Sequence, residues 1–162
     1  MIDDREMLDL IITWLPTGGK VLDVGCAGGE MLMALAERGI RGTGIDPQAR
    51  DSKHCLSLKA EEMEGLTGPY DLVYTRYTLH HLDMPQQFAW KARSVLRPGG
   101  ILLIVDWIER AQTGVSERYF PIERVSRWVR EAGFHILREG VREQSLVIIA
   151  KFESEVNNIP GS

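Results

Sequence analysis

The chain has 162 residues, the size of one domain that buries about two thirds of its unfolded surface. Its hydrophobic content of 44% and charged content of 26% are ordinary for a globular protein, which excludes disordered and collagen-like classes. The formal net charge of −4 gives no overall attraction to phosphate backbones, so nucleic acid is disfavoured as a partner.

Two further features of the sequence concern the location of the protein and the role of its cysteines. The longest purely apolar run, residues 101–105, is too short to span a bilayer, and no signal-peptide pattern opens the chain. We therefore expect a cytoplasmic protein with no membrane span. Cys26 and Cys55 lie far apart, without a CxxC pair or histidines at metal-ligand spacing, so we expect buried thiols and no metal site.

Apolar runs alternate with helical patterns along the first half of the chain, which indicates an α/β protein. Between the second and third strands there is little room for a full helix. The expected elements are a helix at 7–14, strands at 20–24 and 42–46 with a helix at 31–38 between them, and strands at 55–59 and 70–75.

The second half continues the pattern but ends differently. A helix at 86–96 is stopped by residues 97–100 (RPGG), and the apolar strand 101–106 is expected to be central and buried on both faces. A helix at 122–132 follows, and then two strands, 134–142 and 145–152, are separated by only two residues. So short a connection joins only antiparallel strands, which predicts a mostly parallel sheet with one antiparallel strand.

This organisation predicts a single domain over residues 1–152, in which residues 1–19 place a helix over the site. Residues 153–162 are expected to form a disordered tail.

The segment VLDVGCAGGE, residues 21–30, joins the first strand to the first helix of the alternating region, where open α/β sheets bind ligands. A dinucleotide loop would need glycines where Ala27 and Glu30 stand, which counts against NAD and FAD. Asp46 ends the next strand and can accept hydrogen bonds from both hydroxyls of a ribose. Asp23 and Glu30 would repel a pyrophosphate but would tolerate a cationic ligand that lacks phosphate.

The chain resembles the class I S-adenosylmethionine-dependent methyltransferases, particularly their small-molecule branch. The matching segments, in family order and spacing, are residues 21–30, 42–46 (GTGID), 70–82 (YDLVYTRYTLHHL) and 97–106 (RPGGILLIVD). The resemblance implies a Rossmann-like three-layer α/β fold with a mostly parallel seven-stranded sheet of order 3-2-1-4-5-7-6 and strand seven antiparallel. It also implies S-adenosylmethionine as cofactor and S-adenosylhomocysteine as product.

The resemblance assigns the cofactor contacts to four places. They are the loop after the first strand (Asp23, Gly25, Cys26, Ala27 and Gly29), the end of the second strand (Asp46 and Pro47), the adenine loop (Ala60 and Glu61) and the end of the fourth strand (Thr75 and Arg76). Two positions depart from the family pattern: Ala27 stands where many members have glycine, and Lys59 stands where an aspartate often begins the adenine loop.

Methyl transfer from a sulfonium is a direct displacement, so a catalytic base is needed mainly for oxygen acceptors. His81 is the candidate base and Tyr77 an alternative donor or positioning group, although packing roles are open for both. His80 is more readily explained as structural. The connection at 107–121, about fifteen residues long, is a candidate lid or substrate loop whose aromatic residues are Trp107, Tyr119 and Phe120.

These patterns support a methyltransferase that acts on a small or medium-sized acceptor. The alternative is a catalytically silent cofactor-binding or partner-activating subunit with the same fold. A homodimer or a partner subunit is compatible with either hypothesis.

Overall fold

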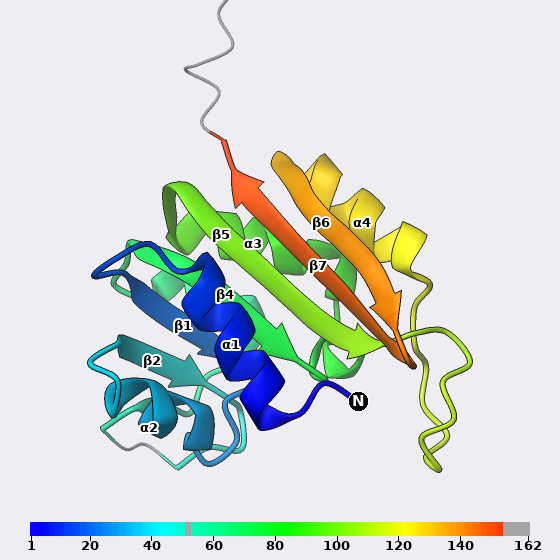
Figure 1. Cartoon of the computed structure of the whole chain (residues 1–162), viewed down its shortest axis with the longest axis horizontal. Coiled ribbons are helices and arrows are strands. Elements are labelled where there is room, and N and C mark those ends of the chain that lie inside the picture. Colours follow the sequence, from blue (N-terminus) through cyan, green and yellow to red (C-terminus); the bar gives the residue numbers. More distant parts are fainter. Residues whose placement is uncertain (51–52, 154–162) are drawn as a thin grey trace, which may run out of the picture.

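The computed structural model describes residues 1–50 and 53–153. A seven-stranded sheet in the order β3-β2-β1-β4-β5-β7-β6 forms the middle of three layers (Figure 1). The strands are β1 (Lys20–Val24), β2 (Arg41–Ile45), β3 (Cys55–Leu56), β4 (Tyr70–Arg76), β5 (Leu96–Trp107), β6 (Phe134–Arg142) and β7 (Ser145–Phe152). Strands β1 to β5 pair in parallel, and β7 runs antiparallel to both β5 and β6. The expected Rossmann-like α/β topology is therefore confirmed.

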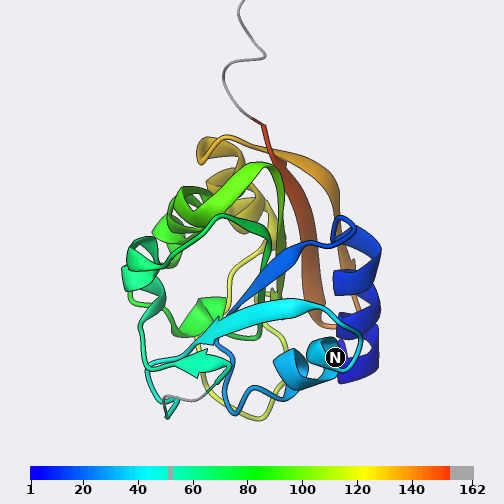
Figure 2. The same ribbon diagram turned by 90° about the vertical axis from the view of Figure 1, so that its left-hand side faces the viewer.

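Helices cover both faces of the sheet (Figures 1 and 2). One face carries α1 (Asp4–Trp14) and α2 (Glu30–Ala36), and the other carries α3 (Phe88–Val95) and α4 (Ile122–Glu131). The described residues also form three short 3-10 helices: η1 (Ala60–Gly65), η2 (Leu79–His81) and η3 (Pro85–Gln87). No helix in the described part of the chain is long and apolar enough to cross a membrane.

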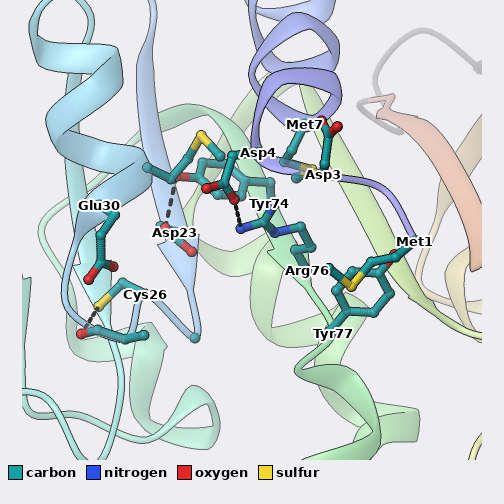
Figure 3. A pocket seen from close by; sticks show the side chains of 13 residues that line it. Met1, Asp3, Asp4, Met7, Asp23, Cys26, Glu30, Tyr74, Arg76 and Tyr77 are labelled. Carbon is teal, nitrogen blue, oxygen red and sulfur yellow. Dashed lines mark hydrogen bonds and ion pairs between the residues drawn. The ribbon is translucent and has the colours of Figure 1, made fainter. Parts of the chain in front are cut away.

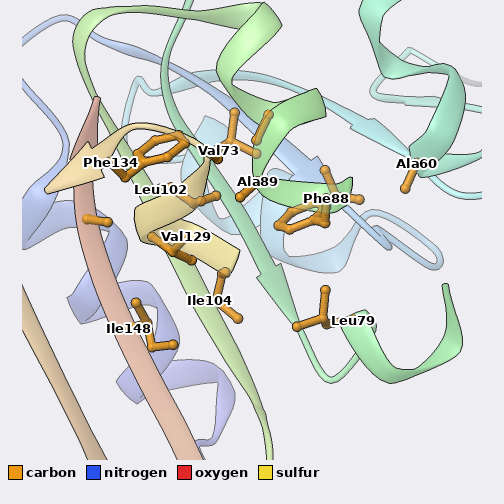
Figure 4. Close-up of a cluster of buried hydrophobic side chains, with 14 of the residues drawn as sticks. Ala60, Val73, Leu79, Phe88, Ala89, Leu102, Ile104, Val129, Phe134 and Ile148 are labelled. Carbon is orange, nitrogen blue, oxygen red and sulfur yellow. The ribbon is translucent and has the colours of Figure 1, made fainter. Parts of the chain in front are cut away.

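Two apolar clusters hold the layers together. Successive side chains of a strand point to opposite faces, so Leu102 of β5 joins the cluster under α3 and α4, and Leu103 joins the cluster under α1 and α2. Figure 4 shows the first cluster, in which Phe88 and Val129 pack over Leu102 and Ile104. Full burial of each such side chain stabilises the folded state by about 1.5 to 3 kcal/mol.

The start of α1 is fixed locally by a capping box. The Asp3 side chain accepts a hydrogen bond from the backbone N–H of Glu6, at 2.8 Å, and the Glu6 side chain accepts one from the Asp3 N–H, at 3.0 Å. Met7, Leu8 and Ile11 then face the sheet. Helix α1 therefore begins at Asp4, three residues before the start at residue 7 that the apolar spacing predicts, because the capping box at Asp3 sets the first turn.

Other boundaries also differ from expectation. β5 begins at Leu96 because the RPGG segment, read as a stop, continues the strand through a bulge in which Leu96 pairs with Tyr70 and Ile101 with Leu72. β3 keeps only two residues before the chain turns toward η1. The predicted tail lies outside the described residues from residue 154 onward.

Candidate active site

Two cavities lie at the carboxyl ends of β1, β2 and β4 and meet at Gly25, where open α/β sheets bind ligands. Cavity A has a volume of about 490 Å³ and is lined by Met1, Asp3, Asp4, Met7, Asp23, Gly25, Cys26, Ala27, Glu30, Met31, Tyr74, Arg76 and Tyr77. Cavity B has a volume of about 460 Å³ and is lined by Val24, Gly25, Ile45, Asp46, Pro47, Gln48, Ala60, Thr78, His81 and Leu82. An elongated ligand can therefore extend over Gly25 from one cavity into the other.

The backbone at Gly25 leaves no room for a side chain. Its φ of +89° is in the left-handed region, and a Cβ there would lie 2.2 Å from Oγ1 of Thr78. The N–H of Gly25 donates to the carbonyl of Ile45 at 2.8 Å, which ties the loop to the end of β2. Glycine at this position thus lets the loop pass close to Thr78, at the junction of the two cavities.

Asp46 stands at the rim of cavity B with its carboxylate held in place. Its Oδ2 accepts from the N–H of Ala27 at 3.1 Å, and its Oδ1 accepts from the N–H of Gln48 at 2.9 Å. A carboxylate oxygen has more than one acceptor direction, so both atoms can still accept ligand hydroxyls. Pro47 and Ala60 form apolar walls of the same cavity.

Asp23 lies at the base of cavity A and is only 5% exposed. The hydroxyl of Tyr74 donates to its Oδ2 at 2.9 Å (Figure 3). Burial raises the pKa of Asp23 to about 7, against the lowering effects of the Tyr74 hydrogen bond and the Arg76 charge. This carboxyl is therefore close to half ionised at neutral pH.

Cavity A is acidic overall. Asp3, Asp4, Asp23 and Glu30 line it, and the cation among its lining side chains, Arg76, is paired with Asp4 at 2.6 Å (Figure 3). Such a surface attracts a cationic ligand and repels a phosphate. The acidic cavity A, the carboxylate of Asp46 in cavity B and the bare Gly25 between them fit a nucleoside linked to a cationic amino acid.

Three residues expected at the cofactor lie outside both cavities. Thr75 is fully buried and its hydroxyl donates to the carbonyl of Val24 at 2.9 Å. Glu61 accepts from the N–H of Asp83 at 3.2 Å and borders a separate small hollow beside α3. Gly29 caps α2 in the left-handed conformation instead of lining a cavity. The structure brings the other eight expected contacts to the two cavities.

The candidate base and its alternative differ in their surroundings. The His81 side chain is 55% exposed and borders cavity B. Tyr77 borders cavity A, but its hydroxyl accepts from the N–H of Ile2 at 2.7 Å and lies 2.6 Å from Oγ of Ser145. Its ring stacks on Trp107 with centroids 4.4 Å apart.

The sequence interpretation missed two acidic residues next to the histidines. Asp106 lies 2.6 Å from Nδ1 of His80, and Glu117 lies 3.1 Å from Nε2 of the same ring. Asp106 could have been found, because a carboxylate that ends a buried parallel strand faces the functional edge of the sheet. Glu117 carries no such signal, because it lies in an irregular segment far along the chain from His80.

The fold and the geometry of this edge define a class I S-adenosylmethionine-dependent methyltransferase. The chain belongs to the methyltransferase domain family, whose model matches residues 3–139. The cofactor of this class is S-adenosylmethionine. Both cysteines are buried, as expected.

Curated relatives that match this chain are named for different acceptors. A ubiquinone biosynthesis O-methyltransferase of Rhizobium leguminosarum bv. trifolii is 27% identical over 142 residues, which cover 80% of this chain and 56% of the relative. A tRNA U34 carboxymethyltransferase of Syntrophotalea carbinolica is 28% identical over 149 residues, which cover 75% of this chain and 46% of the relative. The chain thus spans about half the length of these relatives.

Solved structures share the fold. A 1,6-didemethyltoxoflavin-N1-methyltransferase of Burkholderia thailandensis, determined with bound 1,6-didemethyltoxoflavin and S-adenosylhomocysteine, aligns with a TM-score of 0.71 at 18% identity. The alignment covers 93% of this chain and 77% of that structure.

Proposed function

We propose that this chain transfers the methyl group of S-adenosylmethionine to a small or medium-sized acceptor by direct displacement. The observation that carries the proposal is the junction at Gly25 between the acidic cavity A and the Asp46 side of cavity B. When bound, the cofactor supplies an electrophilic methyl group with a neutral thioether as its leaving group.

The chain's own residues hold the reactants in place. Asp46 accepts hydrogen bonds from the ribose hydroxyls, and Pro47 and Ala60 cover the adenine. In cavity A, Asp23 attracts the ammonium group and Arg76 binds the α-carboxylate of the methionine moiety. Alignment of this kind can lower the activation barrier of a displacement reaction by up to about 7 to 11 kcal/mol.

For a hydroxyl or phenol acceptor, His81 takes the proton as the oxygen attacks. It is exposed, borders cavity B and carries an imidazole, the side chain that most often serves in general acid–base catalysis. The hydroxyl of Tyr77 is already engaged by Ile2 and Ser145, so Tyr77 does not act as a proton donor. It forms part of the cavity wall and positions the acceptor.

A small or medium-sized acceptor is favoured over nucleic acid by the net charge of −4 and by the acidic lining of cavity A. The curated relatives are named for methyl transfer and for carboxymethyl transfer, and they differ in acceptor. The choice of acceptor class therefore rests on the charge of this chain.

The test is turnover with methyl-labelled S-adenosylmethionine and a panel of phenols, amines and thiols. We expect label in at least one acceptor. We expect His81→Ala to lower kcat for an oxygen acceptor about 10²- to 10⁴-fold and to leave the affinity for S-adenosylhomocysteine nearly unchanged. The matched control is His135→Ala, at an exposed position of β6. Cofactor binding without transfer to any acceptor would instead support the silent-subunit alternative.

A further inference from the structure

Side chains from three segments meet beyond the ends of β4 and β5. The buried His80, only 3% exposed at its side chain, has Nδ1 at 2.6 Å from Oδ1 of Asp106, and its backbone N–H donates to Oδ2 of the same carboxylate at 2.9 Å. Asp106 ends the apolar run of β5 and also accepts from the N–H of Trp107 at 2.7 Å. His80 therefore has a fixed orientation.

The other nitrogen of His80 fixes Glu117. Nε2 of His80 lies 3.1 Å from Oε2 of Glu117, and the hydroxyl of Tyr119 donates to the same oxygen at 3.2 Å. Burial lowers the pKa of His80, but the hydrogen bond and charge of Asp106, together with those of Glu117, raise it overall above 6.5. A ring held between two carboxylates fixes Oε2 of Glu117 and leaves its Oε1 for another partner.

That partner is His81. Its ring lies beside the ring of His80, with centroids 3.9 Å apart, and its Nδ1 lies 3.7 Å from Oε1 of Glu117. The separation exceeds a hydrogen bond, but contacts of this kind often tighten only when the substrate is bound. Within residues 1–50 and 53–153, Nε2 of His81 has no hydrogen-bond partner, and the residue borders cavity B.

We infer that Glu117 is a positioning residue that holds the proton of His81 on Nδ1 and so leaves Nε2 bare toward the cavity. The inference rests on the proposed function, because it gives Nε2 its role as proton acceptor. A carboxylate at one ring nitrogen sets which tautomer is present, whereas an imidazole free in water favours the proton on Nε2. Because Glu117 lies between β5 and α4, the base is oriented by the same segment that was expected to act as a lid.

The tautomer of His81 can be read without turnover. The protein is labelled with ¹⁵N in its histidines, saturated with S-adenosylhomocysteine at pH 8, and examined by long-range ¹H–¹⁵N spectra, with the His81 signals assigned from His81→Gln. We expect a protonated Nδ1 and a bare Nε2 in the wild type, and a shift toward protonated Nε2 in Glu117→Ala. Glu109→Ala, an exposed glutamate of the same segment, is the matched control and should keep the wild-type tautomer.

The wild-type spectrum alone can overturn the inference, whatever the variants do: a protonated Nε2 in His81 contradicts it. So does a Glu117→Ala protein that folds and keeps the wild-type tautomer. The three side chains His80, His81 and Glu117 also offer ligand atoms within 4.8 Å of one another. Joint displacement of both histidine signals by Zn²⁺ in the wild type but not in Glu117→Ala, reversed by a chelator, would make Glu117 a metal ligand and would equally overturn the inference.

Kinetics separate this inference from the proposed function. With an oxygen acceptor found in the panel, Glu117→Ala should lower kcat about ten- to a hundredfold, with KM for the cofactor unchanged. The range is that for loss of a group that orients a metal-bound imidazole, taken as the comparable case. In a His81→Ala background the same change should have no further effect. Absence of turnover in the wild type would contradict the proposed function, while the tautomer would still test the role of Glu117.

Discussion

Nη2 of Arg76 lies 2.6 Å from Oδ1 of Asp4, so the guanidinium that borders cavity A is paired with the first turn of α1. The Asp4 side chain is 82% exposed, whereas that of Arg76 is 26% exposed. A pair with so exposed a partner contributes little to stability, about 0 to 1 kcal/mol. A ligand carboxylate can therefore replace Asp4 at Arg76 at small cost.

The first prediction follows from this pair. Arg76→Gln should weaken the binding of S-adenosylhomocysteine by about 1.5 to 3 kcal/mol, the contribution of a hydrogen bond to a charged group. An analogue that lacks the α-carboxylate should bind both proteins equally, as measured by calorimetry. Arg142→Gln is the control, because Arg142 pairs with Glu6 away from cavity A. Equal losses for the two ligands would show that Arg76 acts on the fold and not on the carboxylate.

The second prediction concerns stability and pH at Asp23. Its pKa is raised from 3.8 to about 7 in the folded protein, so the folded state binds more protons than the unfolded state between these values. The free energy of unfolding should therefore lose a contribution as the pH rises from about 4 to 7. The side chain introduced by Asp23→Asn does not ionise, and its amide oxygen can still accept from the Tyr74 hydroxyl. The free energy of unfolding of this variant should therefore exceed that of the wild type by on the order of 2 to 4 kcal/mol at pH 8, and by far less at pH 4. Urea unfolding of both proteins across this range measures the difference, and a gain that does not depend on pH would contradict the assignment.

The third prediction links Asp23 to the cofactor. A bound ammonium or sulfonium favours the ionised carboxylate, so binding of S-adenosylmethionine should release a proton from Asp23 at pH 6. Affinity should rise with pH up to about 7 and then level off. Calorimetry in two buffers of different ionisation enthalpy counts the protons released. The Asp23→Asn protein should release none, and proton release that persists in it would assign the titration to another group.

The fourth prediction tests the junction between the cavities. Gly25 and Gly18 both have positive φ, +89° and +73°, but a Cβ at Gly18 would have nothing within 4 Å, whereas one at Gly25 would meet Thr78 at 2.2 Å. Gly18→Ala should cost about 1 kcal/mol of stability from backbone strain alone. Gly25→Ala should cost more and should also abolish binding of S-adenosylhomocysteine, as followed by thermal unfolding with and without the ligand. Similar behaviour of the two variants would remove the steric argument.

The topology was largely predictable because it rests on short-range signals. The two-residue connection after Arg142 requires antiparallel strands, and the apolar run 101–106 requires a strand buried on both faces. The extension of β5 back to Leu96 was not predictable, because pairing with Tyr70 across a bulge overrides the local tendency of Pro98 and Gly99 to end an element.

The residues that line the two cavities were predictable where a short motif fixes the backbone, in the loop at Asp23 and Gly25 and after β2 at Asp46. It was less predictable where side-chain direction decides. Thr75 and Arg76 are neighbours at the end of β4, yet Thr75 turns to the carbonyl of Val24 and Arg76 to cavity A. The contact of Glu117 with the histidines depends on how the segment between β5 and α4 folds back, which no local pattern specifies.

The central claim is that the two cavities hold S-adenosylmethionine through Asp46, and calorimetric titration with S-adenosylhomocysteine tests it most directly. We predict one site per chain in the wild type, no binding of NAD, and a loss of about 1.5 to 3 kcal/mol in Asp46→Ala, because the ribose hydroxyls then lack a charged acceptor. Asp83→Ala, at an exposed carboxylate outside both cavities, should bind as the wild type does. Binding of NAD in place of S-adenosylhomocysteine, or full affinity in a folded Asp46→Ala protein, would contradict the account.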